Sequence, residues 1–290
     1  MRSNYEYVRL LCFLIALFCF VGHGYAKKTK MKCLTLNLRY DNESDGVNKW
    51  ANRKERVLQF VKDEAADIIS LQEVLERQLN ELDGALDDYA HVGVGRDDGK
   101  TRGEYSPIFY KKEKYEKLDD GCFWLSEHPD SVGSVGWDAS LPRIATWIKL
   151  KEKKKDQAFV VINTHFDHIG RKARLKSAEL IKSWVTETVH SLPVILTGDL
   201  NVTDKSEAYK SLTDEGSLLV DASKVSKKKE GVNYSFHNFG RIKLTDRYKI
   251  DFIFVSPGIK VKECVIPFED SIGGVYISDH NPVIAYILIK

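Results

Sequence analysis

Residues 193–201 read PVILTGDLN, a short apolar run that ends in a glycine, an acid and an amide. The run has the length and the aliphatic, β-branched composition of a buried strand. Asp199 and Asn201 follow it directly. Rigid strands hold short side chains in fixed positions, so polar groups at a strand end are candidates for chemistry. A simple Asx turn after the strand is the structural alternative for Asp199.

Similar segments recur along the chain and predict one α/β domain with mixed sheets rather than strict strand–helix alternation. The sequence after residue 26 contains no internal repeat and no Pro/Ser-rich linker. Helices are expected at residues 52–65 and 170–190. Strands are expected at residues 32–40, 67–73, 106–110, 144–150, 159–165, 193–197, 250–255, 261–266 and 283–289.

The composition is that of an ordinary globular protein. Of 290 residues, 43% are hydrophobic and 30% are charged, which argues against a disordered chain. The formal net charge is +2, from 44 Lys and Arg against 42 Asp and Glu. This balance lacks the basic excess of a protein that holds nucleic acid through many phosphate contacts. It does not exclude a nuclease, because a cleft can be locally basic.

The first 26 residues have the pattern of a signal peptide. A positively charged start precedes the apolar run LLCFLIALFCFV at residues 10–21, which is short for a membrane span. Gly24 and Ala26 offer small residues at positions −3 and −1 of a cleavage site. We therefore expect a signal peptide at residues 1–26 and an exported globular domain at residues 27–290, periplasmic or secreted, with no stable membrane span after cleavage. An uncleaved N-terminal anchor is the alternative.

Three cysteines remain beyond the predicted signal peptide, namely Cys33, Cys122 and Cys264. They are scattered and odd in number, so they form neither a disulfide framework nor a zinc pattern. Cys33 and Cys264 stand among apolar residues and are expected to fill space in the core. The sequence permits one disulfide without choosing its pair.

Acidic, amide and imidazole side chains gather where the predicted strands begin or end. They are Asn37, Glu73, Glu104, His165, Asp199, Asn201, Asp251, Asp279 and His280. Carboxylate and amide oxygens, without cysteine and with few histidines, form a hard-oxygen donor set that suits Mg²⁺ or Mn²⁺. A histidine held by a carboxylate keeps its orientation and can carry a positive charge beside a phosphate.

The motifs around these residues resemble, in their order, the endonuclease/exonuclease/phosphatase superfamily, which includes deoxyribonucleases, abasic-site endonucleases, deadenylases, inositol-polyphosphate phosphatases and sphingomyelinases. The motifs are LNLR, SLQEV, GEYSPIFY, NTHFDH, TGDLN, IDFIFV and SDHNP. Each is weak alone, whereas all of them in order are specific. The resemblance covers about residues 31–290 and implies a four-layer αββα sandwich of two mixed β-sheets flanked by helices, in a member of the secreted bacterial type.

The resemblance implies an exported, divalent-metal-dependent phosphoester hydrolase, in which water attacks phosphorus in line with the leaving group. Glu73 would be the main ligand of the Mg²⁺ or Mn²⁺, supported by Asn37 and Asp279. Asp199 would orient or deprotonate the attacking water, and Asn201 would hold the phosphate or that water. Metal and imidazolium would offset the charge that accumulates on the phosphate oxygens.

Further roles follow from the same resemblance. His280, supported by Asp251, would donate to the phosphate. His165, paired with Glu104, would be a second imidazole, and Arg143 in the segment PRIATW would contact phosphate.

One position departs from part of the superfamily. Arg39 stands two residues after Asn37, where abasic-site endonucleases tend to carry an acid. This argues against that branch and against a second metal.

Structural alternatives remain open at several of these positions. Asp251 enters an apolar strand and could be buried in an ion pair with Arg247, because a buried acid is costly unless it is paired. Asp167 and His168 could cap the helix that is expected near Gly170.

Alternatives also remain open for function. A catalytically inactive member would have lost one of the central polar residues, and all are present. A calcineurin-like phosphoesterase would need D-x-H and GNH[DE] signatures, which the sequence lacks. The substrate stays open between nucleic acid, a phospholipid headgroup such as sphingomyelin, and small esters such as inositol phosphates. We expect a monomer.

Overall fold

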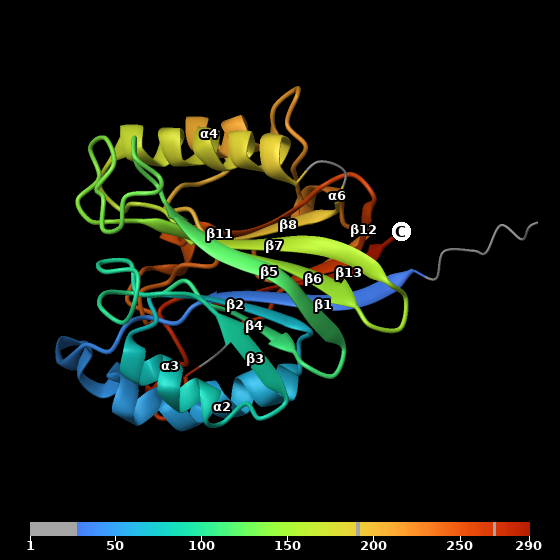
Figure 1. The fold of residues 1–290 in the computed structure, drawn as a ribbon. Helices are drawn as coiled ribbons and strands as arrows, with labels where there is room; N and C mark the ends of the chain where they lie inside the picture. The colour runs from blue at the N-terminus through green and yellow to red at the C-terminus, as the bar shows by residue number, and fades with distance from the viewer. Residues whose placement is uncertain (1–27, 190–191, 269–270) are drawn as a thin grey trace, which may run out of the picture.

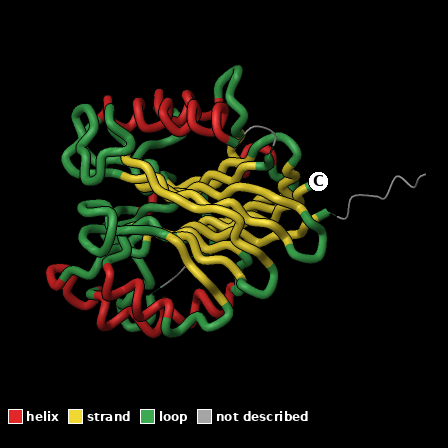
Figure 2. The backbone as a smooth tube through the Cα atoms, viewed as in Figure 1, coloured by secondary structure: helices red, strands yellow, loops and turns green. Residues whose placement is uncertain are grey.

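Two mixed β-sheets pack face to face, and helices cover their outer faces (Figures 1 and 2). This architecture is that of a computed structural model, which describes residues 28–189, 192–268 and 271–290. The predicted signal peptide, residues 1–26, lies outside the described residues. The expected four-layer αββα sandwich is confirmed. Among the described residues, no helix combines the length and the apolar character needed to cross a membrane.

The first sheet has seven strands in the order β10-β12-β13-β1-β2-β4-β3. β1 (Thr29–Asn37) lies at its centre, parallel to β2 (Ile68–Gln72) and antiparallel to β13 (Val283–Ile289). The other strands are β3 (Tyr89–Val92), β4 (Ile108–Lys111), β10 (Lys228–Gly231) and β12 (Ile259–Ile266). Because β1 and β2 are parallel, both end at the same edge of the sheet, where Asn37 is paired with Gln72.

The second sheet has six strands in the order β5-β6-β7-β8-β11-β9. β7 (Gln157–His165) and β8 (Val194–Asp199) are parallel and end together, with His165 paired with Asp199. β11 (Asp251–Val255) runs antiparallel to β8, so that its first residue, Asp251, is paired with Asp199. The other strands are β5 (Tyr115–Trp124), β6 (Ile144–Glu152) and β9 (Val220–Asp221). One end of this sheet therefore collects three polar side chains.

Three apolar layers hold the sandwich together. Successive side chains of a strand point to opposite faces of its sheet, so β1 contributes to two of these layers. Met31 and Cys33 belong to the inner layer between the two sheets, whereas Leu34 and Leu36 belong to the outer layer under the helices of the first sheet. These helices are α2 (Trp50–Glu64) and α3 (Glu76–Asp83), and the second sheet is covered by α4 (Arg171–Thr188) and α5 (Glu207–Thr213). The short segments are η1 (Glu43–Asn48), α6 (Ala222–Val225) and η2 (Leu244–Asp246).

The three cysteines are free in the structure. Cys33 and Cys264 lie in the inner apolar layer, as predicted, and Cys122 is half-buried on β5.

The element boundaries differ from the predicted ones for local reasons. β1 ends at Asn37 rather than at residue 40, because Arg39 adopts φ 61°, in the left-handed region, where an extended strand cannot continue. β4 starts at Ile108 rather than at residue 106, after Pro107, which has no N–H to give to a ladder. β5 was not predicted. Its middle residues are charged and exposed, so the sequence there reads as a loop.

Arg53 of α2 is fully buried and holds together the chain segments at the end of the first sheet where β1 finishes. Its guanidinium donates to the backbone carbonyls of Leu38 (2.6 Å), Arg39 (2.5 Å), Asn48 (2.9 Å) and Ile277 (2.9 Å). Burial lowers the pKa of Arg53 to about 10, so the side chain is still charged at neutral pH. Four carbonyls from three chain segments thus share one cation.

Replacing Arg53 should therefore be costly. Arg53→Met leaves these carbonyls without their donor and is expected to lower the free energy of unfolding by about 3 kcal/mol or more. Urea unfolding followed by circular dichroism measures this loss. Arg77→Met is the matched control, because the Arg77 side chain is 59% exposed in its ion pair with Asp41. An equal loss in both variants would show that Arg53 has no special structural role.

Candidate active site

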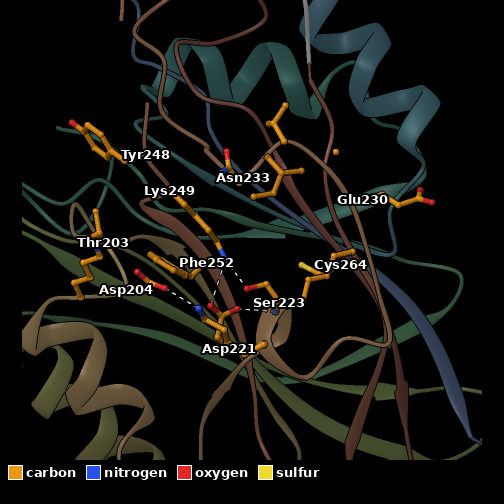
Figure 3. A pocket seen from close by; sticks show the side chains of 16 residues that line it. Thr203, Asp204, Asp221, Ser223, Glu230, Asn233, Tyr248, Lys249, Phe252 and Cys264 are labelled. Carbon is orange, nitrogen blue, oxygen red and sulfur yellow. Dashed lines mark hydrogen bonds and ion pairs between the residues drawn. The ribbon is translucent and has the colours of Figure 1, made fainter. Parts of the chain in front are cut away.

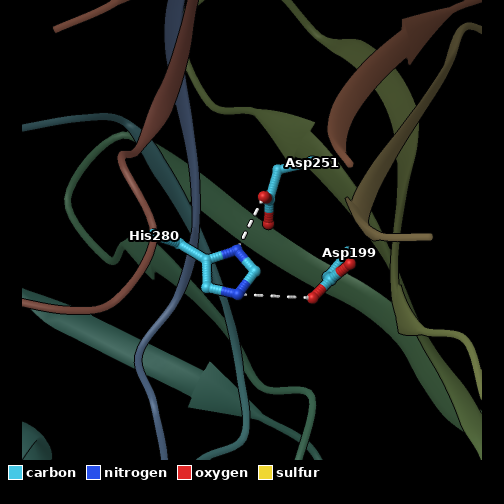
Figure 4. A group of neighbouring side chains, drawn as sticks. All are labelled: Asp199, Asp251 and His280. Carbon is cyan, nitrogen blue, oxygen red and sulfur yellow. Dashed lines mark hydrogen bonds and ion pairs between the residues drawn. The ribbon is translucent and has the colours of Figure 1, made fainter. Parts of the chain in front are cut away.

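Asp199, Asp251 and His280 form a buried cluster at the end of the sandwich (Figure 4). β8 and β11 supply the two acids as paired neighbours, and His280 lies in the segment that leads into β13. The His280 Nδ1 atom is 2.8 Å from Asp251 Oδ2, and the Nε2 atom is 3.8 Å from Asp199 Oδ2. One imidazole thus spans two carboxylates.

The charges in this cluster are strongly coupled. Burial by itself lowers the pKa of His280, but Asp251 and Asp199 outweigh it and raise the pKa to about 10. Burial and the charge of Asp251 raise the pKa of Asp199 to about 7. At neutral pH the imidazole is therefore a cation, and Asp199 is poised to take up a proton.

Asn37 connects this cluster to the first sheet. Its Nδ2 atom donates to Asp199 Oδ2 and to Glu73 Oε1, both at 3.0 Å. Glu73 follows β2, and its Oε2 atom also accepts from the backbone N–H of Tyr40 at 3.2 Å. A single amide therefore fixes two acids that come from different sheets.

Glu73 and Asp279 lie on the first-sheet side of the site, on either side of Arg39. Arg39 Nη1 is 3.9 Å from Glu73 Oε2, and Arg39 Nε is 4.0 Å from Asp279 Oδ2. Burial, followed by the charge of Glu73, raises the pKa of Asp279. We call Asn37, Glu73 and Asp279 the acidic cluster.

His165 and Asn201 complete the second-sheet side. Asn201 follows Asp199 with φ 49°, and its Nδ2 atom lies 2.9 Å from His165 Nε2 and 3.0 Å from the carbonyl of Phe166. Burial, followed by Arg143 and Arg96, lowers the pKa of His165 well below its usual value, so this imidazole is neutral. Its Nε2 atom can then accept from Asn201.

His165 and Glu104 lie close together, as predicted, but they share no hydrogen bond. The two Oε atoms of Glu104 accept from Arg96 at 2.6 and 3.0 Å, whereas His165 Nδ1 is 3.8 Å from Glu104 Oε2. The reason is geometric, because the planar guanidinium matches both carboxylate oxygens at once. Glu104 is therefore a neighbour of His165 whose hydrogen bonds go to Arg96.

Arg143 lies behind His165 and is 4% exposed. It contacts Asp167 Oδ2 at 3.4 Å and His168 Nδ1 at 2.9 Å. Asp167 in turn accepts from the backbone N–H groups of Ile169 and Gly170 at 2.9 and 2.7 Å, in the turn before α4. The N–H groups of the first turn of α4, at Lys172 and Ala173, donate to Asp138 instead, so Asp167 shapes the turn and Asp138 caps the helix. Within the described residues Arg143 is a buried neighbour of the site, and its charge contributes to keeping His165 neutral.

The alternative ion pair between Asp251 and Arg247 is not formed. Arg247 donates to the Tyr234 hydroxyl at 2.8 Å and to the Ile242 carbonyl at 3.0 Å. Asp251 bonds to His280 instead.

Comparisons with known proteins agree with this geometry. Residues 34–280 match the model of the Endonuclease/Exonuclease/phosphatase family. The chain belongs to this family. The matched residues include both sheets' contributions to the site, from β1 to His280.

Individual relatives cover nearly the whole chain. The crystal structure of an endonuclease/exonuclease/phosphatase from Bacteroides vulgatus is 50% identical, covers 91% of this chain and 100% of its own, and has a TM-score of 0.88. A mannosyl-6-phosphatase of Bacteroides thetaiotaomicron is 38% identical, covers 89% of this chain and 99% of its own, and has a TM-score of 0.82. An uncharacterized protein of Acanthamoeba polyphaga mimivirus is 30% identical, over 88% of this chain and 98% of its own.

Members of the endonuclease/exonuclease/phosphatase family are phosphoester hydrolases that depend on divalent metals. Two donor sets in this chain could hold such an ion. Ligand atoms of Asp199, Asp251 and His280 all lie within 4.8 Å of one another. However, the His280 imidazolium has no free lone pair while Asp251 and Asp199 keep its pKa at about 10.

The acidic cluster fits a divalent cation better. It offers oxygen donors only, and burial together with the charge of Glu73 raises the pKa of Asp279, an effect that a bound cation would oppose. The Glu73 side chain is 15% exposed and the Asp279 side chain 9%, so solvent reaches the cluster. Asn37, Glu73 and Asp279 are therefore the residues that would hold the metal.

Several residues beside the site were not among those predicted from the sequence. The ring of Phe236 lies 4.9 Å from the His280 ring and 5.7 Å from the Tyr248 ring, centroid to centroid. Behind the site, Gln72 Nε2 donates to Asn163 Oδ1 at 2.7 Å, between the two sheets. Aromatic residues in a loop and amides in apolar strands have many roles, so only the fold reveals these contacts. Asn163 did stand inside the NTHFDH motif, which could have marked it.

A separate pocket of about 560 Å³ opens between the edges of the two sheets (Figure 3). Inside it, Lys249 Nζ lies 3.0 Å from Ser223 Oγ and 3.4 Å from Asp221 Oδ2. The ring of Phe252 also lines the pocket, and Tyr248 belongs to its lining as well as to the aromatic group beside His280. None of the predicted catalytic or metal-binding residues lines this pocket, so the pocket is not the candidate active site.

The charge of His280 can be tested directly on metal-free protein. In Asp251→Asn the strongest hydrogen-bonded carboxylate is lost while burial remains, so the imidazole should titrate well below pH 10. Nuclear magnetic resonance of labelled histidine side chains measures the titration. Asp246→Asn, in the exposed turn η2, is the control and should leave it unchanged. An unshifted His280 in Asp251→Asn would contradict the assigned role of this carboxylate.

Proposed function

We propose that this chain is an exported hydrolase of phosphate monoesters that works with a divalent cation, Mg²⁺ or Mn²⁺. The observation that carries the proposal is the position of Asp199. Its Oδ2 atom is 3.0 Å from Asn37 Nδ2 and 3.8 Å from His280 Nε2, between the acidic cluster and a cationic imidazole. A carboxylate with a pKa of about 7 in that position is suited to accept a proton from water.

The side chains divide the work of an in-line displacement. Asp199 accepts a proton as the water oxygen forms its bond to phosphorus and the bond from phosphorus to the ester oxygen breaks; the departing alkoxide takes a proton from solvent and leaves as the alcohol. Asn37 keeps the Asp199 carboxylate aimed through the hydrogen bond to its Oδ2 atom. His280 donates from Nε2 to a phosphate oxygen, while Asp251 holds Nδ1. Both N–H groups of the Asn201 amide are engaged by His165 Nε2 and the Phe166 carbonyl, so its Oδ1 atom is the group left to accept from the attacking water. A bound divalent cation, held by the acidic cluster, supplies positive charge where negative charge develops on the phosphate.

Support for a monoester comes from the likeness to the mannosyl-6-phosphatase of Bacteroides thetaiotaomicron, which is 38% identical over 89% of this chain. A terminal phosphate carries up to two negative charges, and protonated His280 and Arg39 bring positive charge to the same end of the sandwich. A net charge of +2 gives little general attraction for long nucleic acids. A hexose 6-phosphate is therefore the first substrate to test.

Hydrolysis should be metal-dependent and confined to this site. We expect the chain to release phosphate from mannose 6-phosphate with Mg²⁺ or Mn²⁺ and to lose this activity in EDTA. Asp199→Asn and His280→Ala should each lower kcat by roughly 10²- to 10⁴-fold, the range for losing a general base or a transition-state donor. Release of inorganic phosphate under saturating substrate measures kcat.

Controls and further substrates make the result decisive. Asp204→Asn changes an acid in the loop after β8 that pairs with Lys224, so it should keep full activity. Plasmid DNA, single-stranded RNA, bis-p-nitrophenyl phosphate, sphingomyelin and an inositol polyphosphate complete the panel. Faster turnover of a diester would replace the monoester assignment, and silence on every substrate would favour a binding function without catalysis.

Export is proposed from the sequence of the first 26 residues. Their charged start, apolar run and small residues before Lys27 are those of a cleavable signal. When the full chain is expressed in a bacterium, the protein should appear outside the cytoplasm with Lys27 as its first residue. N-terminal sequencing of each cell fraction measures this. An intact N-terminus in the membrane fraction would indicate an anchor instead.

A further inference from the structure

Arg39 occupies one flank of the acidic cluster. Its Nη1 atom is 3.9 Å from Glu73 Oε2, and its Nε atom is 4.0 Å from Asp279 Oδ2. Both contacts are too long for hydrogen bonds, so neither acid is fully paired with the guanidinium. The Arg39 side chain is 23% exposed, which leaves part of it facing solvent at the site.

The guanidinium is held in place from behind. Asp45 of η1 accepts from Nε at 2.9 Å and from Nη2 at 2.8 Å, and it is itself only 4% exposed. The ring of Tyr40 lies 4.5 Å from the guanidinium carbon. The backbone is fixed as well, because the N–H of Arg39 donates to Asn37 Oδ1 at 2.9 Å. The cation is therefore positioned before any ligand binds.

The charges around Arg39 limit how many divalent cations can bind to the acidic cluster. Glu73, Asp279 and Asp45 bring three negative charges, and Arg39 and the buried Arg53 guanidinium beside the same acids bring two positive charges, which leaves one negative charge. One divalent cation more than balances that remainder. A second cation would have to approach a fixed guanidinium and would be repelled by it.

The Arg39 guanidinium also has N–H groups that are not used by Asp45. Two of the three guanidinium nitrogens, Nε and Nη2, are engaged by Asp45, whereas Nη1 has only the 3.9 Å contact with Glu73 among the described residues. Its N–H groups are thus available for an oxygen that enters the site. Phosphate oxygens are well suited to such a donor.

We propose that Arg39 acts as a built-in cation that restricts the acidic cluster to one divalent ion and binds a phosphate oxygen beside it. The inference rests on the proposed function for the identity of the phosphate ligand, and on geometry alone for the number of metal ions. It assigns Arg39 two opposite effects, since its charge weakens metal binding and strengthens phosphate binding.

The test measures both affinities on the same variants. Calorimetric titration of the EDTA-stripped chain with Mn²⁺ should give one ion per chain. Arg39→Gln removes the charge with little change of shape, and should bind Mn²⁺ roughly tenfold more tightly. In Mg²⁺ buffer it should bind inorganic phosphate roughly tenfold more weakly.

Two further variants separate charge from structure. Arg39→Lys keeps the charge and loses the bidentate contact with Asp45, so Mn²⁺ affinity should stay near that of the native chain while phosphate affinity falls. Arg77→Gln removes an exposed arginine that pairs with Asp41, and should alter neither affinity. Thermal unfolding of every variant checks that it is folded, and Arg39→Lys carries the phosphate test if Arg39→Gln is not.

Each outcome bears on the inference. Two Mn²⁺ ions in the native chain, or an unchanged Mn²⁺ affinity in Arg39→Gln, would overturn it. A lower unfolding temperature with both affinities unchanged would make the Arg39–Asp45 pair purely structural. If the shifts occur but no substrate is hydrolysed, the proposed function fails and the role of Arg39 stands. If substrates are hydrolysed with two ions bound, the proposed function stands and the role of Arg39 fails.

Discussion

The site depends on one amide group that joins the two sheets. Asn37 ends β1 of the first sheet, and its Nδ2 atom donates at 3.0 Å both to Glu73 and to Asp199 at the end of β8 in the second sheet. Neither acid could keep its position if the sheets slid past each other. The inner apolar layer prevents such sliding along the whole length of the sandwich. Packing in the middle of the molecule thus sets the distance between acids at its end.

Burial raises the pKa of Asp199, which suits it to accept a proton, but burying charged carboxylates also costs folding free energy. Asp199 and Asp251 are 1% and 0% exposed and belong to neighbouring strands, so burial and the charge of Asp251 disfavour the ionised form of Asp199. The imidazolium of His280 offsets part of that repulsion. On the opposite side, Arg39 and Arg53 do the same for Glu73 and Asp279. The molecule therefore tolerates a concentration of acids because cations are interleaved with them.

The sequence predicts the residues at strand ends well, because two local rules suffice. Apolar runs mark the strands, and parallel neighbours must end at one edge, which brings Asn37 beside Gln72 in the first sheet and His165 beside Asp199 in the second. Contacts between distant segments obey no such rule. Glu104 lies 3.8 Å from His165, as expected, but its hydrogen bonds go to Arg96, and the carbonyl partners of Arg53 come from residues up to 224 positions away. Strand β5 escaped prediction because its charged face lies in solvent.

The pairing of Asp199 with Asp251 has a consequence for how this protein can diverge in evolution. Side chains alternate between the faces of a strand, so an insertion or deletion of one residue in β8 or β11 would turn one acid away from the other. Length variation is excluded from these strands. The turn between β6 and β7, at residues 153–156, lies at the far end of both strands from His165 and can change length freely. Lineages of this chain should therefore differ in the lengths of such loops while β8 and β11 keep theirs.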